Sequence, residues 1–147
     1  MTEAELDRYL TLMHRAFREL VRGPDIVLAQ YGLGRAHHRA LFMIRRESEL
    51  SVGDLAAHLA VTTQALHKTL QPLLQQALVL TRADAVDARR KCLTLSAEGT
   101  QLEQQISGMQ RDVFARVQVA VGDACMEDWC RVMAAMEKET LALLPGS

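Results

Sequence analysis

The stretch that decides the fold of this chain is LSVGDLAAHLAVTTQALHKTLQPLLQQAL, residues 50–78. Ser51 is a favourable helix N-cap, and Asp54 follows three residues later, where an acidic side chain satisfies the same helix start. Apolar residues then recur at helical spacing, including Leu55 and Leu59. The segment therefore predicts a short helix over residues 52–59 that buries one face.

A longer helix is expected after a turn at residues 60–61. Either Thr62 or Thr63 caps this helix, and its apolar positions run from Ala65 toward Leu78. Its first turns carry polar side chains on the other face. A short helix, a tight turn and a longer helix with a polar start are the pattern of a helix-turn-helix motif.

The residues after this motif predict a two-stranded ribbon. Residues 79–81 and 91–95 are expected to be short strands, and the segment between them is polar, charged and long for a tight turn. Residues 61–92 hold five basic and two acidic residues, whereas eight acids face four bases from residue 96 onward. A basic centre localises any contact with a polyanion to that centre. A ribbon with a basic tip after a helix-turn-helix is a wing.

Long amphipathic helices are expected on both sides of this centre. The first has an apolar stripe from Leu6 to Val21, which Gly23-Pro24 either kinks or ends before a new helix, and the pattern stops at Tyr31-Gly32. A second helix is expected over residues 35–46. Ser96 is expected to cap a long helix ending at Val121-Gly122, and Asp123 to cap the last one.

The apolar stripes of the terminal helices exceed what a compact wing domain needs to cover. They predict a helical dimerisation layer made by residues 1–34 and 96–147, with residues 35–95 as the winged helix-turn-helix region. The expected fold is therefore mainly α, a winged helix-turn-helix domain with a short two-stranded β-wing and N- and C-terminal helices that form the dimer.

Composition agrees with a helical, cytoplasmic protein. Of the 147 residues, 49% are hydrophobic but only 4% are aromatic, which suits a helical core of aliphatic side chains. No segment approaches the ~18 to 20 apolar residues of a membrane span, and the N-terminus does not read as a secretion signal. Cys92, Cys125 and Cys130 are an odd number without framework spacing, so reduced, buried and inert thiols are expected for all three.

The sequence offers no pattern of an enzyme. It has no glycine-rich phosphate loop, no nucleophile elbow, no His-Glu-x-x-His and no convincing acid pair. Neither the cysteine spacing nor the adjacent His37 and His38 resembles a metal-ligand set. No catalytic residue, metal or cofactor is expected.

The order of elements and several motifs resemble the MarR family of bacterial transcription regulators over nearly the whole chain. The landmarks are LSVGDLAA at residues 50–57, ALV at 77–79, Asp87-Ala-Arg89, and LTLSAEG at 93–99. Two departures are Ala77, where the family usually has glycine, and Pro72 inside the second helix of the motif. An alanine forced to positive φ costs roughly 1 kcal/mol, and proline deletes one helical hydrogen bond.

The resemblance implies double-stranded DNA as partner, bound by a homodimer at an approximately palindromic operator. Gln64 suits adenine, and Lys68 suits guanine or a phosphate. In the family, the wing arginine matching Arg89 enters the minor groove and the acid matching Asp87 holds it. The candidate DNA-binding residues are Ser51, Thr62, Thr63, Gln64, His67, Lys68, Gln71, Arg82, Asp87, Arg89, Arg90 and Lys91.

Members of the family often bind small aromatic or phenolic acids between the dimerisation layer and the DNA-binding lobe. The candidates for such an effector site are Met13, Phe17, His37, His38, Phe42 and Met109. The alternative is that these residues are ordinary core residues. Redox sensing through a cysteine in the first helix is not supported, because no cysteine precedes Cys92.

The expected function is that of a dimeric repressor whose affinity for DNA an aromatic effector lowers. The alternative is a helical protein-interaction module that has kept the fold and lost specific DNA binding. Pro72 and the modest positive charge of the centre favour that alternative, whereas Asp87, Arg89 and the polar face that begins at Thr62 argue against it.

Overall fold

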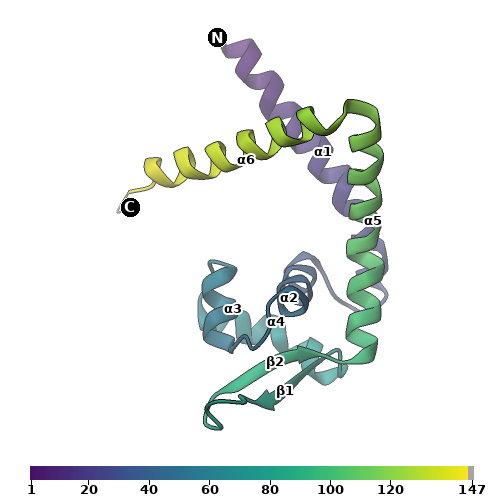
Figure 1. Ribbon diagram of the computed structural model, residues 1–147, viewed down its shortest axis with the longest axis vertical. Helices are drawn as coiled ribbons and strands as arrows, with labels where there is room; N and C mark the ends of the chain where they lie inside the picture. Colours follow the sequence, from purple (N-terminus) through teal and green to yellow (C-terminus); the bar gives the residue numbers. More distant parts are fainter. Residues whose placement is uncertain (146–147) are drawn as a thin grey trace. The chain divides into compact units, whose positions relative to one another are not determined.

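The structure is a computed structural model and describes residues 1–145 (Figure 1). Its elements are the helices α1 (Glu3–Ala29), α2 (Arg35–Arg46), α3 (Val52–His58), α4 (Thr63–Gln75), α5 (Ala97–Val121) and α6 (Asp123–Leu143), and the strands β1 (Val79–Ala83) and β2 (Lys91–Leu95). This confirms the winged helix-turn-helix fold expected from the sequence. The chain forms two compact units, Met1–Gln110 and Arg111–Ser147. These units are defined by packing and not by function. The predicted division into a DNA-binding region, residues 35–95, and a dimerisation region, residues 1–34 and 96–147, therefore stays a prediction.

The core of the first unit is aliphatic and joins the helix-turn-helix to both flanking helices. Its fully buried members include Leu28 from α1, Leu41 from α2 and Ile106 from α5. The helix-turn-helix contributes Leu55, Leu66, Leu70 and Leu73. Because these leucines lie on one side of α3 and α4, the opposite side of α4 is left to solvent.

Helix α1 runs through Pro24 without a break, so the two-helix alternative for this segment is wrong. Pro24 is buried in the last third of the helix, and its ring removes one backbone donor without ending the helix. Gly32 then takes φ +67°, and Leu33 N donates to Leu28 O at 3.0 Å. The chain thus reverses at the glycine where the sequence predicted the end of the pattern.

The wing is an antiparallel hairpin. Val79 pairs with Leu95 and Ala83 pairs with Lys91, so β1 is two residues longer than predicted. The segment before α3 adds to this hairpin, because Ser51 bridges to Cys92 and Leu93 N donates to Leu50 O at 2.8 Å. Strand β2 is therefore tied at Cys92 and Leu93 to the segment that precedes the helix-turn-helix.

The second unit consists of the end of α5 and all of α6. The rings of Phe114 and Trp129 lie 5.4 Å apart within it, but no residue of α6 is buried. Cys125 and Cys130 are exposed on this helix, so the expectation of buried thiols is wrong for these two cysteines. The expected cap at Asp123 is wrong: Gly122, at φ +84°, is the N-cap of α6, and Asp123 Oδ1 accepts from Gln118 Nε2 at 2.7 Å. Among residues 1–145, no helix is long and apolar enough to cross a membrane.

Candidate nucleic-acid interface

The start of each helix in the helix-turn-helix is capped as its sequence predicts. Ser51 Oγ accepts from Asp54 N at 3.1 Å, and Asp54 Oδ2 accepts from Ser51 N at 3.0 Å, which completes a capping box. Thr62, rather than Thr63, caps α4, and its Oγ1 accepts from Ala65 N at 3.1 Å. Thr62 therefore has a structural role at the helix start whatever else it contacts.

The outer face of α4 is polar, exposed and free of acidic residues. Thr63 lies at its first turn, and a shallow groove on this face is lined by Gln64, His67, Lys68, Gln71, Leu74 and Gln75. The helix continues through Pro72 to Gln75, so the proline does not shorten the face. Unpaired amide groups at the helix start and the Lys68 ammonium make this surface favourable for an anion.

The tip of the wing is a loop ordered by two aspartates. Asp84 Oδ1 accepts from Val86 N at 2.7 Å and from Asp87 N at 3.2 Å. Asp87 Oδ1 in turn accepts from Arg89 N at 3.0 Å. Asp87 therefore holds Arg89 through its backbone amide.

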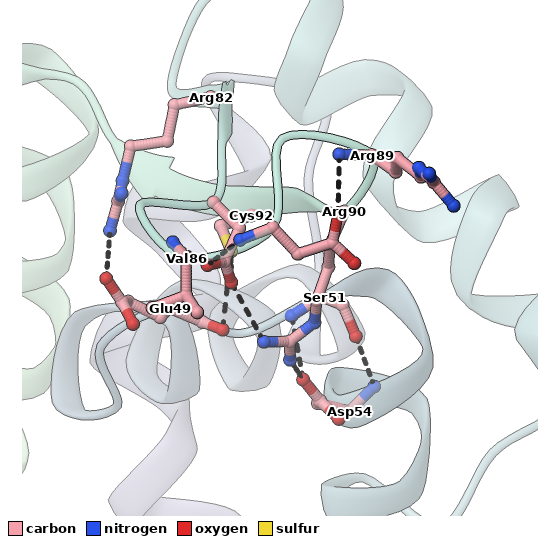
Figure 2. Close-up of polar contacts among 10 residues, drawn as sticks. Glu49, Ser51, Asp54, Arg82, Val86, Arg89, Arg90 and Cys92 are labelled. Carbon is pink, nitrogen blue, oxygen red and sulfur yellow. Dashed lines mark hydrogen bonds and ion pairs between the residues drawn. The ribbon is translucent and has the colours of Figure 1, made fainter.

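The four basic residues of the wing have different surroundings, and Figure 2 shows three of them, Arg82, Arg89 and Arg90. The side chain of Arg89 extends away from the other labelled residues, and Lys91 is exposed; neither has an ion pair within residues 1–145. Arg82 Nη2 lies 3.8 Å from Glu49 Oε1. The Arg90 side chain is directed toward Asp54, away from Arg89, and pairs with Asp54 and with Asp84.

The sequence did not predict that Asp54, Asp84 and Glu49 form ion pairs with the basic residues of the wing. Hydrogen bonds from Val86 and Asp87 backbone amides, from the Cys92 thiol and from Arg90 lower the pKa of Asp84 to about 2. Hydrogen bonds from Ser51, together with the charge of Arg90, lower the pKa of Asp54. Burial and the carboxylate of Asp84 raise the pKa of the Cys92 thiol, so the thiol stays protonated and donates to Asp84.

The comparisons with known proteins identify the family that has this order of elements. The family model for the MarR family matches residues 31–90, which span α2 to the wing loop. The HTH-type transcriptional regulator PetP of Rhodobacter capsulatus is 35% identical over 136 residues, 92% of this chain and 82% of PetP. The chain belongs to the MarR family. It is a MarR-family transcriptional regulator with the winged helix-turn-helix DNA-binding fold.

Solved MarR-type structures share the fold at lower identity. A Staphylococcus aureus MarR in complex with salicylate and kanamycin has a TM-score of 0.75 and 17% identity, covering 97% of this chain and 96% of that protein. A Staphylococcus aureus MepR mutant bound to an oligodeoxyribonucleotide has a TM-score of 0.61 and 20% identity, covering 90% and 97%.

The six effector candidates lie on α1, α2 and α5 of the first unit. Met13 and Phe17 are exposed on α1, and Arg35 lies 5.7 Å from the centre of the Phe17 ring. His37 Nδ1 accepts from Gly34 N at 2.9 Å, and burial lowers its pKa.

The remaining candidates also have contacts of their own. His38 Nε2 lies 3.1 Å from Ser107 Oγ, and Arg46 covers the Phe42 ring at 5.1 Å. Met109 is 38% exposed. None of the six lines the groove on α4 or the second surface groove, which runs from Arg18 to Arg35. No cluster of histidine, cysteine and acidic residues among residues 1–145 is arranged to hold a metal.

Proposed function

We propose that this MarR-family regulator binds a specific double-stranded DNA operator as a homodimer. The observation that carries the proposal is the pairing of an acid-free, exposed α4 face with Arg89 at the wing tip, where nothing within residues 1–145 neutralises it. The N-terminal half of α4 is of a size to enter the major groove, while a narrow minor groove attracts a guanidinium.

Within this proposal each residue contacts the part of the DNA that suits the chemistry of its side chain. Gln64 and Gln71 present amides that pair with base edges, and Lys68 presents a charge for guanine or phosphate. Thr63, His67 and Lys91 lie exposed around them. Ser51 and Thr62 cap their helices, so they orient the interface and add at most a phosphate contact. The basic wing supplies affinity that depends on salt.

Apolar surface on the terminal helices supports the homodimer. In α6, Trp129, Met133 and Met136 recur on one face and are 45%, 37% and 38% exposed. In α1, Leu10 and Phe17 are each 52% exposed. Contiguous exposed apolar faces of this kind mark interaction sites, and a second copy of the chain covers them with the same chemistry. A dimer also provides two copies of α4 for half-sites about one helical turn apart.

A small aromatic acid is the effector class that we propose, with repression relieved when it binds. Support comes from the salicylate bound to the similar Staphylococcus aureus MarR and from cations that already lie over aromatic rings here, Arg35 over Phe17 and Arg46 over Phe42. Such a ligand changes the population of DNA-competent dimers only if it binds the two conformations unequally. Salicylate is the probe for this part of the proposal.

The decisive experiment selects the duplexes that the protein binds from a random library. The affinity of the protein for the enriched duplexes is then measured by fluorescence anisotropy at several salt concentrations. Enrichment of a palindromic sequence, with affinity that falls as salt rises, is the expected result. Lys68→Ala should weaken binding to the enriched duplex, whereas Arg18→Ala should not, because Arg18 is on α1 and pairs with Glu19. Adding salicylate should then release the DNA.

Failure to enrich any sequence with a folded dimer would contradict the proposal. It would favour the alternative of a protein-interaction module on the same fold, because such a module needs the exposed helices but no selectivity for bases. If selection succeeds but salicylate and related aromatic acids leave the anisotropy unchanged, only the effector class is lost.

A further inference from the structure

Arg90 joins two parts of the molecule that the sequence separates by 36 residues. Its Nη1 donates to Asp84 Oδ2 in the wing at 3.0 Å, and its Nη2 donates to Asp54 Oδ2 in the first turn of α3. One planar guanidinium thus bridges two carboxylates, a geometry that depends on the fixed fork of arginine. Figure 2 shows the Arg90 side chain directed toward Asp54 and away from Arg89.

Both ends of this bridge are themselves held. The Asp84 side chain is 5% exposed and also accepts from Val86 N, Asp87 N and the buried Cys92 thiol. Asp54 is fixed by the capping box with Ser51. A carboxylate with several donors has little freedom to follow a moving partner, so the guanidinium transmits the position of α3 to the wing.

The loop of the wing needs such a tie because the backbone anchors end at Cys92 and do not include the loop residues 84–90. Leu93 N donates to Leu50 O, and Cys92 bridges to Ser51, but residues 84–90 bond only among themselves through their backbone. Apart from the bridge, two side-chain links join the wing to the segment before α3. The Cys92 thiol lies 3.4 Å from the Glu49 carbonyl oxygen, and Arg82 lies 3.8 Å from the Glu49 carboxylate, with both of those charged side chains more than 40% exposed. Exposed pairs of that kind contribute little.

We propose that Arg90 is a positioning residue, which fixes the wing against α3 so that the neighbouring Arg89 meets DNA at a set distance from α4. Arg90 makes no DNA contact of its own in this assignment, which departs from the direct role that the sequence suggested for it. The inference rests on the proposed DNA-binding function. It also predicts an effect on the free protein, which keeps the two separable.

The first test is a double-mutant cycle on the selected duplex. Arg90→Ala should weaken binding by about ten-fold in the wild-type background, because Arg89 is displaced. In an Arg89→Ala background the same change should have almost no further effect, since Arg90 acts through the side chain already removed. Independent, multiplying losses would instead mean that Arg90 touches DNA itself and would overturn the proposal.

The second test is Arg90→Lys, which keeps the charge and the fold but cannot bridge two carboxylates with one rigid fork. Lysine should lose about as much affinity as alanine if Arg90 positions the wing. Full rescue by lysine would point to a phosphate contact and contradict the proposal.

The third test needs no DNA and uses amide hydrogen exchange of residues 84–90 in the free protein. Arg90→Lys should speed exchange there relative to wild type, while Arg89→Ala should leave it unchanged. Equal exchange in wild type and Arg90→Lys would overturn the positioning role even if DNA binding were normal. Absence of selective DNA binding by the wild type would overturn the proposed function, and exchange would still decide whether Arg90 holds the wing.

Discussion

Gly99 lies so close to Leu78 that a β-carbon at position 99 would fall 1.9 Å from the Leu78 carbonyl oxygen. The same oxygen accepts from Ser96 N at 3.1 Å, so the backbone between β1 and the start of α5 is held at this point. The obstacle is main chain and cannot rotate away. Helix α5 therefore begins against the end of the helix-turn-helix because residue 99 has no side chain.

Gly99→Ala should destabilise the protein by ~1 to 3 kcal/mol, because the new methyl group forces the backbone of α5 away from Leu78. Chemical denaturation followed by circular dichroism measures this. Gly108→Ala is the matched control in the same helix, since nothing lies within 4 Å of its added β-carbon. That control should stabilise the helix by roughly 0.5 to 1 kcal/mol, and equal effects of the two changes would refute the close contact.

Ala77 adopts φ +52°, a left-handed conformation in which an alanine β-carbon is strained. Ala77→Gly should relieve roughly 1 to 2 kcal/mol of strain and add roughly 0.5 to 1 kcal/mol of chain entropy to the unfolded state. The net expectation is a modestly higher midpoint in thermal unfolding. A lower midpoint would show that Ala77 contributes packing that outweighs its strain.

The depressed pKa of Asp84 predicts a particular acid sensitivity. The pKa of this carboxyl falls from 3.8 to about 2 in the folded protein, so its ionised form stabilises the native state above the unfolded value. This contribution should disappear as the pH falls from about 4 to about 2. Asp84→Asn should flatten the loss of stability in that window, as measured by urea unfolding at stepped pH. Parallel profiles for the two proteins would contradict the role assigned to Asp84.

Much of this molecule could be predicted from local sequence signals. The bounds of α2 were predicted exactly, and the capping of α3 by Ser51 followed from the S-x-x-D spacing. The end of the first helical pattern at Tyr31-Gly32 was predicted, and Gly32 takes the positive φ at which the chain reverses. These features depend only on residues within a few positions of one another, so a short stretch of sequence is enough to predict them.

The features that were missed depend on distant partners. Whether Pro24 breaks a helix is decided by the core that buries it, and no local rule distinguishes a kink from an end. Asp123 was a good cap by residue type, but Gly122 could take a positive φ and assumed that position instead. The bridge from Arg90 to Asp54 joins the wing loop to helix α3, 36 residues away in the sequence. Residue type and position alone therefore identified Arg90 only as one more basic residue of the wing.

The exposed stripe on α6 predicts how the dimer can be broken. Met133→Glu places a charge on the apolar face and should raise the dimer dissociation constant by at least about ten-fold, because a buried, unpaired carboxylate is costly. Analytical ultracentrifugation measures this. Ala135→Glu adds the same charge about 200° around the helix and should leave the dimer intact. Dissociation by both variants, or by neither, would exclude this face as the interface.

The free guanidinium at the wing tip leads to a prediction about salt. Arg89→Ala should weaken binding to the selected operator and lower the magnitude of the slope of log K against log salt by about 1 for each subunit, because one counterion-releasing contact is lost. Anisotropy titrations at four or five salt concentrations give both quantities. Arg82→Ala is the matched control within the wing, since that side chain faces Glu49. If Arg82→Ala flattens the slope and Arg89→Ala does not, the wing meets DNA through its other side, and the contact assigned to Arg89 is wrong.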